Sequence, residues 1–143
     1  MRTLVLDTNV VLDLFVFADA RTGSLQAELD AGQAQWIATP RMREELTRVL
    51  AYAHIESRLA YYQLSAPEVL ARFDHYVRIV EAPERAGVTC RDPDDQMFID
   101  LAVAHKCLLI SKDTAVLSMR KRLAMLDVVA AAILPAPLPD ALG

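Results

Sequence analysis

The stretch that decides the fold is Met1-Arg2-Thr3-Leu4-Val5-Leu6-Asp7-Thr8-Asn9, at the start of the chain. A short apolar run that ends at polar turn formers is typical of a parallel strand buried on both faces of an α/β sheet. Ligands bind such sheets outside the carboxyl ends of the strands, which is where Asp7 stands. Asp7, Thr8 and Asn9 are also good N-caps for a following helix. Taken alone, the stretch supports a helix cap and a ligand-binding acid equally.

Strand-like and helix-like stretches alternate along the rest of the chain. The expected further strands are 35–38, 77–81, 108–110 and 127–133, and the expected helices are 10–17, 22–29, 40–53, 55–63, 66–75, 92–105 and 117–123. This alternation predicts a three-layer α/β/α sandwich around a mostly parallel sheet. We expect one domain over residues 1–134, followed by a Pro-rich C-terminal tail, 135–143, that cannot continue regular structure.

Composition narrows the function classes. The 143 residues are 54% hydrophobic and carry a formal net charge of −4, so the chain lacks the general basic character of many nucleic-acid-binding proteins. A net negative charge also results if several acids are gathered around a cation. The two cysteines, Cys90 and Cys107, are not at metal-ligand spacing and fit a reduced, cytoplasmic protein. No apolar run approaches the roughly 20 residues needed to span a membrane, so we expect no membrane contact. The apolar segments 10–17 and 128–134 are candidate surfaces for a homodimer.

Helix periodicity separates two neighbouring acids in the helix that follows Pro40. Its apolar stripe consists of Met42, Leu46, Val49, Leu50 and Ala53. At 100° per residue, Glu45 lies about 85° from the centre of the stripe, whereas Glu44 lies roughly opposite it. Glu44 is therefore expected to face water, and Glu45 to lie at the seam between the helix and the core.

The helix that begins near residue 92 separates its acids in the same way. Its apolar stripe consists of Phe98, Leu101, Ala102 and His105. Asp95 lies about 60° from the centre of this stripe, whereas Asp94 and Asp100 lie about 160° away. Asp92 is expected to be the N-cap before Pro93, with an assisting role near a metal as the alternative. Asp95 is thus the acid of this helix that points toward the sheet.

A fourth acid, Asp113, follows the expected strand 108–110 in the way that Asp7 follows the first strand. Inward-facing acids are costly to bury unless they are paired or bind a metal. Arg41, one turn before Glu45, and Lys112, next to Asp113, could each form an ion pair with one acid. A shared divalent cation accounts better for all four acids. Oxygen ligands favour Mg²⁺ or Mn²⁺, and without a His/Cys cluster zinc is not expected.

These residues resemble the PIN domain family, in particular the bacterial PIN-family toxins of toxin–antitoxin systems. The resemblance covers nearly the whole chain in order, although residues 55–85 match no motif. It is carried by Leu4-Val5-Leu6-Asp7-Thr8-Asn9-Val10, Glu44-Glu45-Leu46-Thr47-Arg48-Val49-Leu50, Asp92-Pro93-Asp94-Asp95-Gln96-Met97-Phe98 and Leu109-Ile110-Ser111-Lys112-Asp113.

The resemblance implies a five-stranded parallel sheet in the order 3-2-1-4-5 and Mg²⁺- or Mn²⁺-dependent cleavage of RNA. Carried over by motif, the catalytic and metal-binding acids are Asp7, Glu45, Asp95 and Asp113. Thr8 would hydrogen-bond the first Asp or a water on the metal, and Asn9 would order the turn. Ser111 keeps the hydroxyl that family members have before the last acid. With Asp7 as a ligand, the cap of the first helix would pass to Thr8 or Asn9.

The leading hypothesis is a phosphodiesterase in which bound metal activates a water molecule. Arg41 and Lys112 are expected to meet the RNA at the rim, and a candidate partner is an antitoxin protein. For the basic run 120–122, a solvated helix face is the preferred interpretation. The alternative function is a non-catalytic PIN-fold module that binds RNA or protein. A haloacid-dehalogenase-like phosphatase is a poor match, because that family has a second Asp where this chain has Asn9.

Overall fold

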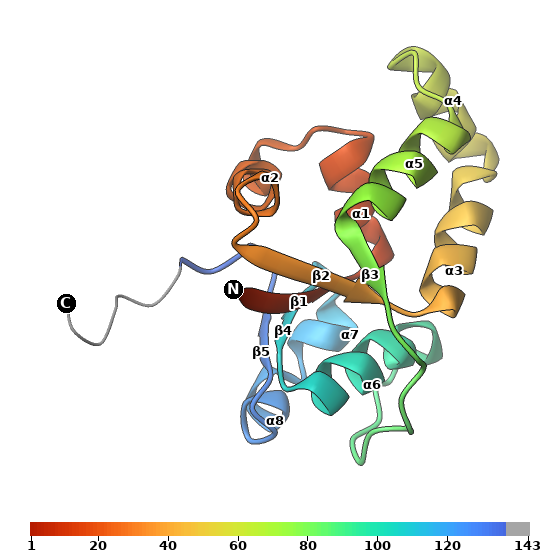
Figure 1. The fold of residues 1–143 in the computed structure, drawn as a ribbon. Helices are drawn as coiled ribbons and strands as arrows, with labels where there is room; N and C mark the ends of the chain where they lie inside the picture. Colours follow the sequence, from red (N-terminus) through yellow and green to blue (C-terminus); the bar gives the residue numbers. More distant parts are fainter. Residues whose placement is uncertain (137–143) are drawn as a thin grey trace.

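Five parallel strands form a single sheet in the order β3-β2-β1-β4-β5 (Figure 1). The structure, a computed structural model, describes residues 1–136. The strands are β1 (Arg2–Leu6), β2 (Ala34–Ala38), β3 (Val77–Ile79), β4 (Leu108–Ile110) and β5 (Val129–Ala131). Both the fold class and the strand order are as predicted. Most of the predicted tail, residues 137–143, lies outside the described residues.

Helices cover both faces of the sheet. They are α1 (Thr8–Phe15), η1 (Ala20–Thr22), α2 (Gly23–Asp30), α3 (Pro40–Leu50), α4 (Ala53–Tyr61), α5 (Ala66–Tyr76), η2 (Pro93–Asp95), α6 (Gln96–His105), α7 (Thr114–Leu117) and α8 (Arg120–Ala124). Figure 1 shows α1 to α5 on one side of the sheet and α6 to α8 on the other, which gives the predicted three layers. Within residues 1–136, none of the helices combines the length and apolar character that crossing a bilayer would require.

The central strand β1 lies between β2 and β4, and its residues Leu4 and Val5 are completely buried. From β1 the chain adds β2 and then β3 on one side, and it later adds β4 and β5 on the other side of β1. The direction in which strands are added therefore reverses between β1 and β4. In open α/β sheets this reversal leaves a crevice at the carboxyl ends of the strands, where ligands bind. Asp7 immediately follows β1 at this edge.

Two helices that carry predicted site residues begin as expected. Thr39 caps α3 by accepting a hydrogen bond from the backbone N–H of Met42, and Pro40 occupies the first helical position. Asp92 caps the turn that contains Asp95 by accepting from the backbone N–H of Asp94 at 3.0 Å. The predicted capping role of Asp92 is therefore confirmed.

Several predicted boundaries were wrong. The helix expected to reach residue 53 ends at Leu50, because the backbone of Tyr52 is extended and separates α3 from α4. The helix expected over 117–123 is divided into α7 and α8. His105, placed on the apolar stripe of its helix, is exposed, since α6 ends there and Lys106 turns the chain with a left-handed conformation.

Candidate metal centre

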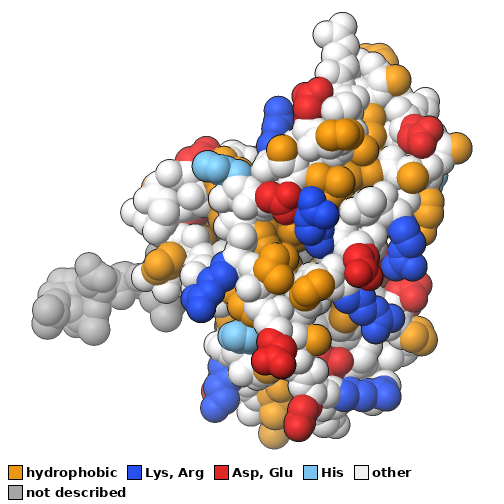
Figure 2. Space-filling model, turned by 45° about the vertical axis from the view of Figure 1, so that its right-hand side comes forward, with side chains coloured by type: hydrophobic (Ala, Val, Ile, Leu, Met, Phe, Trp, Pro, Cys, Tyr) orange, Lys and Arg blue, Asp and Glu red, His pale blue; other side chains and the backbone are white. Residues whose placement is uncertain are grey.

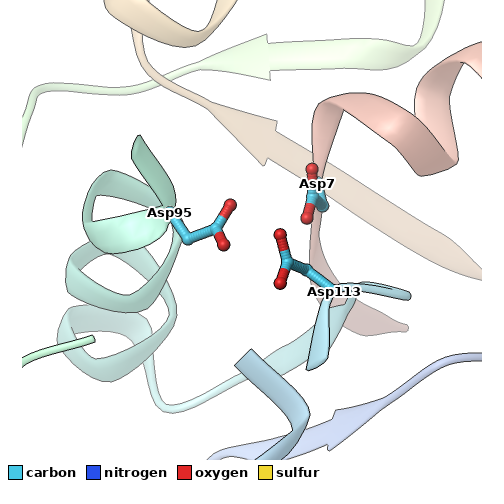
Figure 3. Close-up of side chains that lie close together, drawn as sticks. All are labelled: Asp7, Asp95 and Asp113. Atoms are coloured by element: carbon cyan, nitrogen blue, oxygen red, sulfur yellow. The ribbon is translucent and has the colours of Figure 1, made fainter. Parts of the chain in front are cut away.

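Three carboxylates converge at the crevice between β1 and β4. Asp7, Asp95 and Asp113 each offer an oxygen, and these oxygens lie within 4.8 Å of one another (Figure 3). Asp7 follows β1, Asp113 follows the end of β4, and Asp95 ends η2, directly before α6. Asp7 and Asp95 are buried, and Asp113 is half-buried. The fold thus brings together carboxylates of residues that are more than one hundred positions apart in the chain.

Asp7 and Asp113 also cap the helices that follow them. Asp7 Oδ1 accepts from the backbone N–H of Asn9 at 3.2 Å, and Asp113 Oδ1 accepts from that of Ala115 at 2.8 Å. The expectation that Thr8 or Asn9 would take over the cap of α1 was wrong. A carboxylate has two oxygens that accept several hydrogen bonds, so Asp7 can cap α1 while it faces the other acids.

The acidic cluster is electrostatically unfavourable without a cation. Burial is the largest effect on Asp7, and it raises the pKa of this carboxyl above its ordinary value. Burial, the hydrogen bond with Asp113 and the negative charges of Asp7 and Asp113 raise the pKa of Asp95 from 3.8 to about 8. Asp95 Oδ2 is the one buried side-chain polar atom within residues 1–136 that has no hydrogen-bond partner.

These properties fit a hard divalent cation. Mg²⁺ and Mn²⁺ prefer carboxylate oxygens, and a cation among the three acids would offset their mutual repulsion. It would also give Asp95 Oδ2 the partner that residues 1–136 do not supply. The donor set contains no thiolate or imidazole, which a zinc site would favour.

Glu45, the fourth predicted acid, lies beside this group of three rather than within it. Thr8 Oγ1 donates a hydrogen bond to Glu45 Oε2 at 2.9 Å, which ties α3 to the start of α1. Thr8 was expected to bond Asp7 or a water on the metal. Its hydroxyl donates to Glu45 and not to Asp7, and a bond to a water on the metal stays a prediction. Burial and the charge of Asp7 raise the pKa of Glu45, although the Thr8 hydroxyl acts in the opposite direction. A direct bond between Glu45 and metal stays a prediction.

A family model described as PIN domain (PIN_3) matches residues 3–115, which include all four predicted acids. The chain belongs to the PIN domain family. PIN domains are typically metal-dependent nucleases, and the cluster of Asp7, Asp95 and Asp113 agrees with an active site of that kind. No curated protein matches the chain significantly.

Ser111 connects two acids of this PIN domain. Its completely buried Oγ donates to Asp7 Oδ2 at 2.6 Å and accepts from the backbone N–H of Asp113 at 3.1 Å. The hydroxyl therefore links the end of β4 to the end of β1. Asn9, in contrast, contributes its backbone N–H to Asp7, while its side chain is exposed.

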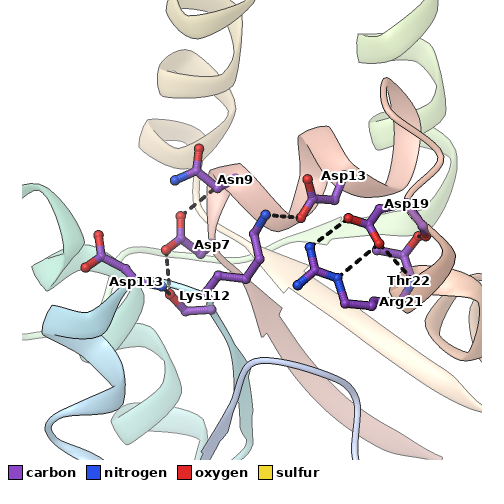
Figure 4. Close-up of polar contacts among 9 residues, drawn as sticks. Asp7, Asn9, Asp13, Asp19, Arg21, Thr22, Lys112 and Asp113 are labelled. Carbon is purple, nitrogen blue, oxygen red and sulfur yellow. Dashed lines mark hydrogen bonds and ion pairs between the residues drawn. The ribbon is translucent and has the colours of Figure 1, made fainter.

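Lys112 does not pair with the neighbouring Asp113, which was one of the sequence-based alternatives. Its ammonium group forms an ion pair with Asp13, from the last turn of α1 (Figure 4). Asp13 was not among the predicted site residues, although it is the only charged residue in an apolar run and its side chain is 12% exposed. A single charged residue within this apolar run was the feature of the sequence that could have identified Asp13. Contact between Lys112 and RNA stays a prediction.

The predicted helix faces are confirmed for both pairs of neighbouring acids. Glu44 is exposed and Glu45 is half-buried, while Asp94 is exposed and Asp95 is only 6% exposed. Arg41, predicted to meet the substrate, is exposed and lines a hollow together with Glu45. Helical periodicity thus selected the acids that face the centre of the PIN domain.

Proposed function

We propose that this PIN domain is a Mg²⁺- or Mn²⁺-dependent endoribonuclease. The observation that carries the proposal is the convergence of Asp7, Asp95 and Asp113, with Asp95 Oδ2 buried and unpartnered among the described residues. Membership of a family of typically metal-dependent nucleases supports hydrolysis of a phosphodiester. RNA as the substrate is supported by the resemblance of the four motifs to the bacterial toxins.

The chain's own residues would hold and orient the reacting groups. Asp7, Asp95 and Asp113 would bind the cation, which supplies an activated water and stabilises negative charge on the phosphate. Ser111 keeps Asp7 and the start of α7 in register, so that the acids remain in position. Glu45, held by Thr8 beside the three acids and with a raised pKa, is suited to accept a proton from the attacking water.

A protein nucleophile is not needed, and the cysteines are poorly suited to act as one. Both Cys90 and Cys107 are buried, and burial raises the pKa of the Cys107 thiol to about 12. The pKa of Cys90 is also raised, chiefly by burial. Since the thiolate is the reactive form, neither sulfur is activated. Hydrolysis by water is therefore the chemistry that the site supports.

Cleavage of single-stranded RNA by the purified protein in Mn²⁺ tests the proposal. The expected result is that Asp7→Asn abolishes cleavage, because it removes a charged ligand while its remaining oxygen can still accept from Ser111. Glu44→Gln is the matched control, since Glu44 is exposed on the face of α3 away from the core. Equal cleavage by the wild type and Asp7→Asn would mean that the activity comes from a contaminant or another site. Metal binding without turnover on varied RNAs would instead favour the non-catalytic module.

We further propose that the nuclease is the toxin of a toxin–antitoxin pair acting in the cytoplasm, with an antitoxin protein as partner and a homodimer as its assembly. The resemblance to bacterial PIN-family toxins supports this role. Expression of the wild type in a bacterium is then expected to arrest growth, and Asp7→Asn is expected to relieve the arrest. Growth arrest by both proteins alike would argue against a toxin that acts by cleavage.

A further inference from the structure

A hollow of about 360 Å³ adjoins the metal centre. It lies between α3, the start of α6 and the chain that connects β3 to η2. Two of its lining residues connect it to the acids: Glu45 is bonded to Thr8, next to Asp7, and Asp94 directly precedes Asp95. The hollow therefore lies next to the metal centre, and Asp7, Asp95 and Asp113 are not part of its lining. Its volume falls within the range of small-ligand sites, roughly 300–1,000 Å³.

Three arginines line the hollow: Arg41 and Arg48 from α3, and Arg85 from the connection after β3. We call it the arginine pocket. Within residues 1–136 the ion pairs are Arg2–Glu28, Arg21–Asp19, Arg43–Asp74 and Lys112–Asp13, so none of the three guanidinium groups is in one. Guanidinium groups recognise phosphate by paired hydrogen bonds. Three of them beside a phosphodiesterase centre form a potential phosphate site.

Side chains of α6 hold the wall that carries Arg85. The backbone N–H of Cys90 donates to Gln96 Oε1 at 2.7 Å, and Gln96 Nε2 donates to the carbonyl of Val88 at 3.0 Å. The backbone N–H of Ala86 donates to Asp100 Oδ1 at 2.9 Å. A connection without regular secondary structure is thus fastened at every second residue. The backbone of this wall is therefore held in place by α6, while the side chains of Arg41, Arg48 and Arg85 are exposed.

The pocket contains three acids as well as three arginines. Asp100 accepts hydrogen bonds from Ala86 and Gln96, and Glu45 accepts one from Thr8 while the positive charge of Arg48 also acts on it. Asp94 is exposed. Figure 2 shows a side of the molecule on which blue basic side chains alternate with red acids and orange apolar groups. That side therefore lacks a broad basic face. Local recognition of a phosphate explains the arginines better than general attraction of a polyanion.

We infer that the arginine pocket binds the phosphate of a nucleotide that flanks the cleaved bond in single-stranded RNA. The apolar part of its lining, which includes Pro93 and Met97, provides a surface for the base. Because RNA as the substrate is itself proposed above, this subsite rests on the proposed function. Arg48 and Arg85 become substrate-positioning residues alongside Arg41.

Binding of RNA can be measured without turnover. Asp7→Asn protein, which is expected not to cleave, is titrated in Mg²⁺ into a fluorescein-labelled single-stranded RNA of twelve nucleotides, and fluorescence anisotropy is recorded at several salt concentrations. Arg48→Gln and Arg85→Gln are added to this background. Arg43→Gln is the matched control, because Arg43 lies on the same helix but is paired with Asp74. Circular dichroism checks that all variants are folded.

Each pocket variant is expected to bind the RNA about tenfold more weakly, the usual effect of removing a hydrogen bond to a charged group. The slope of log K against log salt should decrease by about 0.7 for each phosphate that the variant no longer neutralises. Arg43→Gln should keep both the affinity and the slope. Three results would overturn the assignment: RNA binding weakened to the same extent in Arg43→Gln, RNA binding unchanged in the pocket variants, or no binding of RNA at all. So would displacement of the RNA by a hexaglutamate peptide as effective as unlabelled RNA, because the pocket would then recognise acidic protein segments.

The outcome is separable from that of the cleavage assay. Arginine-dependent binding by a protein that never cleaves RNA would refute the nuclease and retain the pocket only as a binding site for an RNA phosphate. Cleavage by the wild type together with unchanged binding in the pocket variants would retain the nuclease and refute the pocket.

Discussion

Replacing Asp95 with Asn is expected to stabilise the metal-free protein at alkaline pH. Asp95 is buried beside Asp7 and Asp113, and its Oδ2 has no partner within the described residues. Ionised Asp95 therefore has a desolvated charge next to two others of the same sign. Asn removes that charge, and its amide N–H can donate to Asp113. Asp95, which is proposed to bind metal, thus destabilises the folded protein when metal is absent.

The sign of the pH dependence follows from the raised pKa of Asp95. In the folded protein this pKa is about 8, against an ordinary value of 3.8. Between these values the unfolded chain ionises first, so the free energy of unfolding of the metal-free wild type decreases as the pH rises. The amide introduced by Asp95→Asn does not titrate, so the advantage of this variant grows through the same window and is complete above about pH 8.

Ionising a buried carboxylate that lacks a partner costs at least as much as an unsatisfied buried polar group, roughly 1–3 kcal/mol. The amide of Asp95→Asn stays neutral and avoids this cost. For a chain of 143 residues, each kcal/mol shifts Tm by about 3 °C. The Tm of Asp95→Asn should accordingly exceed that of the wild type by roughly 3–10 °C at pH 8 in EDTA. Near pH 5 the difference should be much smaller, because Asp95 is then mostly protonated in the folded state.

Calorimetric melting of both proteins in EDTA at the two pH values provides the test. Asp94→Asn is the matched control, since Asp94 is the exposed neighbour of Asp95 in the same turn. Saturating Mn²⁺ should raise the Tm of the wild type more than that of Asp95→Asn. An Asp95→Asn protein that is no more stable than the wild type at pH 8, or equally shifted at both pH values, would refute the reasoning.

Two further predictions concern the residues that support the acids. Ser111→Ala removes the hydroxyl that bridges Asp7 and the Asp113 backbone. It should reduce both the rate of RNA cleavage and the affinity for Mn²⁺ by about 10–100-fold. Cleavage kinetics and titration calorimetry measure these two quantities, and unchanged values for both would exclude a positioning role for Ser111. Lys112→Ala leaves the largely buried Asp13 without its ion-pair partner and should lower the free energy of unfolding by roughly 1–3 kcal/mol. In urea unfolding, Asp13→Asn should restore much of the stability that Lys112→Ala removes, and purely additive effects of the two changes would contradict the importance of the pair.

The sequence alone determined the fold class and most of the acid selection. The apolar runs that precede Asp7 and Asp113 indicated parallel strands. A strand that is buried on both faces of a sheet is apolar throughout and does not alternate between apolar and polar residues. Helical periodicity distinguished Glu45 from Glu44 and Asp95 from Asp94, since a step of 100° separates adjacent residues. The strand order itself came from the family resemblance, because local patterns do not specify which strands become neighbours.

Only the tertiary structure decided the partners within the site. The hydrogen bond between Thr8 and Glu45 joins residues 37 positions apart, and that between Ser111 and Asp7 joins residues 104 positions apart. Periodicity specifies the face on which a side chain lies, whereas its partner depends on how separate elements pack and which rotamers they allow. For this reason Lys112 pairs with Asp13 instead of the adjacent Asp113. The arginine pocket arises in the same way, because Gln96 and Asp100 hold a connection with no periodicity of its own against α6, across the hollow from α3.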